Sequence, residues 1–252
     1  EVAAYLNVNA SFISTPTSLT SVIWSDKHEE EYNHVARMHP GELDLGSVSR
    51  VDELVSSLIA GELSLVEADV RLTDIEDKIK FLHPLGMMCA YSMATGAFAV
   101  LMGASLLDAL AAGSIGIVMY LFVFWSYRSK RVMYMLEPTI AIVAGVLACA
   151  IGHYLEPGIN IRLVVLSSII VFIPGLALAI GLAELSSRHV VSGTARVMDA
   201  LMQLFKLYFG AFLGISLGFA LFSEVEHTPM DKLPSWSLFV AVLLLCSALV
   251  PI

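Results

Sequence analysis

The sequence predicts an α-helical polytopic membrane protein with about six transmembrane helices, one of them broken at a Pro-Gly pair, behind a small α+β domain. Hydrophobic residues make up 57% of the chain and charged residues only 15%, whereas about a quarter of a soluble globule is charged. The formal net charge of −9 lies on residues 1–80, which hold 15 acidic and 6 basic side chains. We therefore expect a soluble domain at 1–80 and a transmembrane domain at 81–252.

Six apolar stretches follow the soluble domain. Each has about the 17–25 residues that an α-helix needs to cross a hydrocarbon layer roughly 30 Å thick. They run over 82–102, 106–127, 133–154, 163–185, 197–222 and 236–252. The fourth contains Pro174-Gly175 at its middle. Because proline removes a donor and clashes with the preceding turn, the helix should break there and expose N–H groups that can hold a carboxylate.

Basic residues predict the orientation of the helices. They precede the first stretch and lie in alternate connections: Lys78, Lys80, Arg128, Lys130, Arg131, Arg188 and Arg196. The positive-inside rule places the soluble domain and these loops in the cytoplasm, with the helices in the cytoplasmic (inner) membrane. The chain starts without Met and stops inside an apolar run, so we expect a piece of a longer protein.

The front domain has a strand-rich start and two helices. Residues 8–38 alternate in strand fashion, and helices are expected over 49–60 and 64–80. The second helix begins with a capping box, Ser64 with Glu67. Three histidines (His28, His34 and His39) match no metal-site or nucleophile signature. We expect no enzyme activity, metal or cofactor, and the acidic charge argues against nucleic acid as a partner.

Charged residues within the apolar stretches are the candidates for function. Each costs at least about 2.5 kcal/mol at the centre of a bilayer, so we expect each to have a partner or a function. They are Asp108, Glu137, Glu184, Asp199 and Lys206. Asp199 and Lys206 lie two turns apart on one helix, so they either satisfy neighbouring helices or line a substrate path.

The fifth stretch carries one continuous polar and glycine face. Its members recur every three or four residues: Arg196, Asp199, Gln203, Lys206, Gly210, Gly214 and Gly218. The three glycines predict a helix-packing ridge. The polar half should face a cavity or a partner rather than lipid.

Three sets of motifs follow one another along the chain. The front domain carries Arg37, Asp44-Leu45 and the helix start at Ser64. The first membrane pair is joined by Gly103-x-x-x-x-Asp108. The most specific segment is Pro174-Gly175, followed by Glu184 and by a loop with Ser192-Gly193-x-x-Arg196. In the order and spacing of these motifs the chain resembles the ThrE/YjjP family of threonine/serine exporters.

The resemblance implies secondary-active, proton-driven export of small hydrophilic amino acids such as threonine or serine, in antiport with protons. It also implies a second membrane module, fused or separate, and the present chain would be the N-terminal one. The substrate carboxylate would meet the helix after Pro174-Gly175. Asp108 or Glu184 would meet the ammonium or carry the proton, with Asp199 as a further proton candidate.

Other functions stay open. Lys206 suits an anionic substrate, which favours a subunit of a split exporter of dicarboxylates such as succinate. The glycine ridge favours a non-transporting assembly subunit or an oligomer. A membrane-anchored enzyme that uses the front domain is the third alternative.

Overall fold

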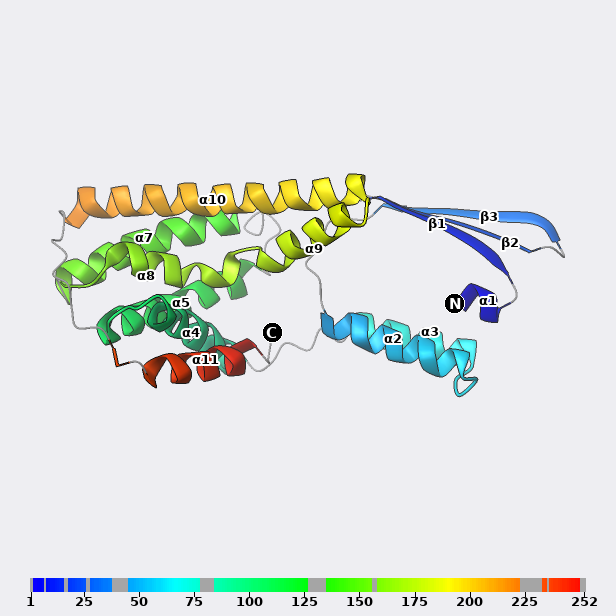
Figure 1. Cartoon of the computed structure of the whole chain (residues 1–252), viewed down its shortest axis with the longest axis horizontal. Coiled ribbons are helices and arrows are strands. Elements are labelled where there is room, and N and C mark those ends of the chain that lie inside the picture. Colours follow the sequence, from blue (N-terminus) through cyan, green and yellow to red (C-terminus); the bar gives the residue numbers. More distant parts are fainter. Residues whose placement is uncertain are drawn as a thin grey trace. The chain divides into compact units, whose positions relative to one another are not determined.

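The computed structural model describes residues 2–6, 8–15, 18–25, 28–37, 45–77, 84–126, 135–155, 158–222, 233–234 and 236–249. The chain divides into two compact units. Unit 1 comprises Glu1–Lys80 and Gly175–Asp199, and unit 2 comprises Phe81–Pro174 and Ala200–Ile252. Figure 1 shows that helices dominate and that the strands are confined to the front of the chain.

The front domain contains a three-stranded antiparallel sheet in the order β1-β2-β3 (Figure 1). Its strands are β1 (Asn9–Thr15), β2 (Ser18–Ser25) and β3 (His28–Arg37). Short connections join neighbouring strands, so the sheet is a simple meander whose register changes only between Trp24 and Ser25 in the described part. The strands predicted over 8–38 are confirmed.

In its described part this domain also contains the helices α1 (Val2–Tyr5), α2 (Leu45–Ile59) and α3 (Leu65–Asp77). A small core of Leu54, Leu58 and Ala68 joins α2 to α3. The predicted capping box forms at the start of α3. The Glu67 carboxylate accepts from the Ser64 N–H at 3.0 Å and from the Ser64 hydroxyl at 2.8 Å.

Six apolar segments follow, where the sequence predicts them. Among the described residues, four helices are long and apolar enough to cross a membrane: α4 (Pro84–Leu101), α5 (Leu106–Ser126), α7 (Leu136–Tyr154) and α10 (Val190–Phe222). The fourth predicted stretch is interrupted, with α8 (Ile161–Ser168), a 3-10 turn η1 (Ile170–Phe172) and α9 (Gly175–Ser186).

The interrupted segment passes the same test only as a bent pair, with 45° at the break, so the described residues offer four spans or up to five. The sixth segment, α11 (Trp236–Leu249), has 14 residues and is shorter than a full span. Residues 250–252 of that stretch lie outside the described residues.

Unit 2 has a core of small side chains. Fully buried residues include Ala99, Ala112, Ala141, Ala144 and Ala148. Small residues let helices in a membrane approach closely and gain dispersion energy. α4 packs on α5, α11 packs on α4, and α5 contacts both α7 and α8.

The glycine ridge of α10 lies against α7 of the same chain. A Cβ placed on Gly145 of α7 would lie 2.6 Å from the carbonyl carbon of Gly214, and one on Gly210 would lie 2.7 Å from the Pro138 oxygen. Gly218 faces Cys149 in the same way. The ridge therefore brings two backbones of one chain into contact.

The link between α9 and α10 differs from the prediction. α10 begins at Val190 rather than 197, so the expected loop Ser192–Arg196 is helical. The chain reverses in three residues, where Arg188 has a φ of 64° and the His189 N–H donates to the Glu184 carbonyl at 2.9 Å. Hydropathy found only the apolar part of α10, because a helix can extend beyond that part with polar residues.

Gly214→Leu should separate α7 from α10, because any side chain there meets the Ile142 backbone. We expect the thermal midpoint of the purified protein to fall, since overpacking costs about 1–3 kcal/mol or more. Ala220→Leu, on an exposed position of the same helix, is the matched control. Equal midpoints for the two variants would contradict the close contact.

The capping box predicts a pH-dependent contribution of Glu67 to stability. Hydrogen bonds from the backbone N–H and hydroxyl of Ser64 lower the pKa of this carboxyl below its ordinary 4.5. The stabilisation is present above pH 4.5 and is lost as the pH falls through the lowered pKa. Carboxyl NMR titration of Ser64→Ala should show the pKa of Glu67 rising toward 4.5, whereas Ser56→Ala should leave it unchanged.

Candidate functional site

Asp108 lies at the tight connection between α4 and α5. Gly103 has a φ of 78° and ends α4, with its N–H donating to the Val100 carbonyl at 3.0 Å. A side chain is strained in this conformation, which explains the glycine of the Gly103-x-x-x-x-Asp108 motif. Ser105 then starts α5 as its N-cap.

The Asp108 carboxylate is buried, with 4% of the residue exposed, and it has three donors. One oxygen accepts from the N–H of Ser105 at 3.0 Å and from its hydroxyl at 2.8 Å. The other accepts from the Asn160 N–H at 2.7 Å, and the Asn160 side chain caps α8 by accepting from the Leu163 N–H. Asp108 therefore ties the start of α5 to the start of α8.

Lys206 of α10 is paired with Glu137 in the first turn of α7. Its Nζ lies 3.8 Å from Glu137 Oε2, and the side chains are 42% and 24% exposed. The Oε2 atom is itself buried and has no hydrogen-bond partner among the described residues. The two opposite charges compensate each other between helices, and one carboxylate oxygen still has acceptor capacity.

A side chain of α10 stabilises the break in the fourth apolar segment by a hydrogen bond. Beyond η1, Ile173 is extended, with φ −75° and ψ 121°, so the helix ladder cannot continue through Pro174. The Phe172 carbonyl accepts instead from the Gln203 side chain at 3.1 Å. The Phe172 ring also packs on Tyr91 of α4, with ring centroids 6.1 Å apart.

Glu184 forms a separate polar cluster in unit 1, between the end of α9 and the start of α10. Its carboxylate lies 3.3 Å from the Arg196 guanidinium and accepts from the Ser192 hydroxyl at 2.7 Å. A Cβ on Gly193 would lie 2.9 Å from the Gly181 carbonyl oxygen. The Ser-Gly-x-x-Arg motif is thus a close helix contact with an ion pair beside it.

The structure distributes the predicted site residues over both units. Asp108, Pro174 and Lys206 belong to unit 2, whereas Gly175, Glu184 and Asp199 belong to unit 1. Gly175 is exposed at the first position of α9, and Asp199 is exposed on α10 without a hydrogen bond or ion pair to any described residue.

Sequence reasoning named Glu137, Gln203 and Ser192 but did not pair them with Lys206, the Phe172 carbonyl and Glu184. It did not single out Ser105 or Asn160 as partners of Asp108. The pattern Ser105-x-x-Asp108 resembles a capping box and was the one available signal. The other pairs join positions from 8 to 69 residues apart, so no local pattern could find them.

The histidines of the front domain offer no site in the described part. His34 is exposed on β3, the His28 side chain is not among the described ones, and His39 lies outside the described residues. Across the described ranges, no three His, Cys, Asp or Glu residues gather to hold a metal ion.

The chain is similar to a known protein family and to curated membrane proteins. The family model ThrE, described as "Putative threonine/serine exporter", matches residues 1–218. The curated relatives include Pheromone-regulated membrane protein 10 of Debaryomyces hansenii, 26% identical over 238 residues, and its namesake in Pichia sorbitophila, 25% identical over 240 residues.

Each match covers 90% of this chain but only 22% and 23% of the relatives. The chain therefore spans less than a quarter of their length. No solved structure matches.

Asp108→Asn should destabilise the protein. An amide oxygen can replace one carboxylate oxygen, but the amide NH₂ then faces a donor of Ser105 or Asn160. A buried donor left without an acceptor costs about 1–3 kcal/mol. Thermal unfolding of the purified protein should show a lower midpoint than for the native chain, and Asp199→Asn, at an exposed carboxylate, should not. An unchanged thermal midpoint for Asp108→Asn would argue against the role of Asp108 in joining the start of α5 to the start of α8.

Proposed function

Because the chain belongs to the ThrE family of threonine/serine exporters, we propose that it exports small hydrophilic amino acids, such as threonine or serine, in exchange for protons. It would do so as the N-terminal module of a secondary transporter of the cytoplasmic membrane, with the front domain in the cytoplasm. Transport rather than catalysis is assigned to it, and a second membrane module is its expected partner.

The observation that carries the proposal is the ion pair of Glu137 and Lys206 between two apolar helices. An amino acid at neutral pH carries one carboxylate and one ammonium. Its carboxylate can therefore replace Glu137 as the partner of Lys206, and its ammonium can replace Lys206 as the partner of Glu137. The net charge in the apolar layer does not change. Desolvated charges that stay paired avoid the large cost of an isolated buried charge.

In this arrangement Lys206 would receive the substrate carboxylate and Glu137 the ammonium. The Glu137 Oε2 atom accepts no hydrogen bond in the described part of the chain, so it can take one from an ammonium. Lysine is a compact cation with three donors, which suits a carboxylate.

Proton exchange would follow from competition at the same carboxylate. Glu137 can bind either the substrate ammonium or a proton, and a site that holds one at a time exchanges them across the membrane. Asp108 and Glu184 remain proton candidates from the sequence. Their carboxylates already accept hydrogen bonds from described neighbours, which favours Glu137.

A dicarboxylate such as succinate is the second candidate substrate, because Lys206 is a cation and half of its side chain is shielded. A dianion would need a further positive charge from another module. Substrates of the two classes differ in the ammonium group, so Glu137 should matter for threonine alone.

Efflux from cells loaded with a threonine-containing dipeptide tests the pair, with any natural second module co-expressed. Lys206→Met and Glu137→Gln should each lower threonine efflux about tenfold or more, because a charge-assisted contact to the substrate is lost. Lys206→Arg should retain part of the activity, and Asp69→Asn, at an exposed carboxylate of α3, should match the native chain at equal membrane levels.

Three results would contradict the proposal or a part of it. Threonine efflux at the native rate in Glu137→Gln would mean that the pair is not part of the substrate site. Succinate efflux that depends on Lys206 but not on Glu137, with no threonine efflux, would establish the dicarboxylate class instead. Collapse of the pH gradient should slow native efflux, and an unchanged rate would exclude proton exchange.

A further inference from the structure

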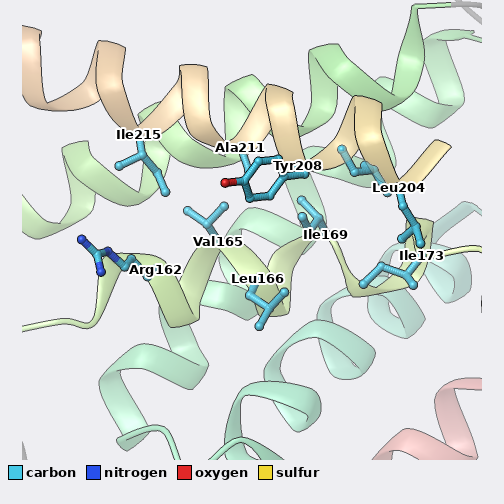
Figure 2. A pocket seen from close by; sticks show the side chains of 10 residues that line it. Arg162, Val165, Leu166, Ile169, Ile173, Leu204, Tyr208, Ala211 and Ile215 are labelled. Atoms are coloured by element: carbon cyan, nitrogen blue, oxygen red, sulfur yellow. The ribbon is translucent and has the colours of Figure 1, made fainter. Parts of the chain in front are cut away.

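A groove of about 260 Å³ lies between α8 and α10 in unit 2. It is lined by apolar side chains, one tyrosine and one arginine: Arg162, Val165, Leu166, Ile169, Ile173, Leu204, Leu207, Tyr208, Ala211 and Ile215. Figure 2 shows the two sets of side chains facing each other across it.

The two walls are matched antiparallel stripes. On each, the lining residues follow the first by 3, 4, 7 and 11 positions, from Arg162 to Ile173 and from Leu204 to Ile215. Arg162 and Ile215 lie at one end and Ile173 and Leu204 at the other (Figure 2). Along α10 the groove is about 16 Å long, close to the roughly 15 Å of one leaflet's hydrocarbon layer.

Burial shows that the groove has a closed floor and an open side. Val165, Ile169 and Leu207 are buried, with 5% exposure or less. Leu166 and Tyr208 are 45% and 72% exposed at the rims. A flexible apolar chain can therefore enter from the side without displacing the helices.

Arg162 gives one end of the groove a positive charge. It lies in the first turn of α8, which Asn160 and Asp108 fix in place. Its side chain is exposed, and no described residue forms an ion pair with it. A guanidinium binds phosphate through two parallel hydrogen bonds.

We propose that this groove binds an anionic glycerophospholipid, with one acyl chain along the apolar walls and the phosphate at Arg162. A transmembrane helix, about 10–12 Å across, is too thick for this volume. A free phosphate would leave the apolar walls uncovered. The proposal does not depend on the exporter assignment, since the lipid would bind whatever solute is moved.

Native mass spectrometry of the full chain, released from nanodiscs of dioleoylphosphatidylglycerol and dioleoylphosphatidylcholine, tests the headgroup contact. The native chain should retain phosphatidylglycerol preferentially. Arg162→Gln should reduce this preference about tenfold, because a charge-assisted contact is lost, and Arg162→Lys should restore part of it. Arg188→Gln removes an exposed cation of unit 1 and should have no effect.

The acyl-chain contact is tested separately. Ala211→Phe places a large side chain in the groove and should reduce retention of both lipids, whereas Ala220→Phe, at an exposed position of the same helix, should not. Dihexanoylphosphatidylglycerol should bind the native chain more weakly than the dioleoyl lipid. This comparison needs no variant, so it holds even if Ala211→Phe does not fold.

Several outcomes would overturn the proposal. An unchanged preference for phosphatidylglycerol in Arg162→Gln would argue against the headgroup site. Equal binding of the dihexanoyl and dioleoyl lipids would argue against the acyl-chain site. Displacement of the lipid by excess inorganic phosphate would indicate an ion site alone. Loss of a dimer in Ala211→Phe, without a change in bound lipid, would assign the groove to a second copy of the chain.

Discussion

The backbone contact between α7 and α10 is the constraint on which the rest of unit 2 depends. It exists because glycines lie at the crossing, among them Gly145 and Gly214. Without a hydrophobic driving force between helices in lipid, close packing is the main source of association. The same contact brings Lys206 within reach of Glu137 and turns another side of α10 toward α8. The charge pair and the apolar groove are therefore two consequences of one helix crossing.

A second constraint is that polar groups in an apolar layer need partners. The helix break at Pro174 leaves the Phe172 carbonyl without a donor from its own ladder, and Gln203 supplies one. Asp108 satisfies the turn before α5 and the cap of α8 at once. These residues resemble a substrate site in sequence, because an intramembrane polar group looks the same whether it binds a solute or satisfies backbone. In the structure both side chains form hydrogen bonds with backbone groups, so both stabilise the fold.

The remaining charges differ in how completely they are satisfied. Glu184 is engaged by both Arg196 and Ser192. Glu137 has one cation at 3.8 Å and a buried oxygen that accepts no hydrogen bond from the described residues. A carboxylate that releases and rebinds partners during transport needs an oxygen that is still able to accept a hydrogen bond in the resting state. This difference, rather than position in the sequence, separates the pair at Lys206 from the other acidic candidates.

The sequence by itself determined the apolar helices, the strand-rich front domain, the capping box at Ser64 and the break near Pro174, because each follows from local chemistry such as hydropathy, side-chain alternation or a missing donor. It also identified the face of α10 that carries glycine and charge. Only the tertiary structure decided what that face meets, that the glycines pack within one chain, and that Lys206 pairs with Glu137. Those contacts join residues far apart in the chain, and the identity of the neighbour depends on how helices cross rather than on any local pattern.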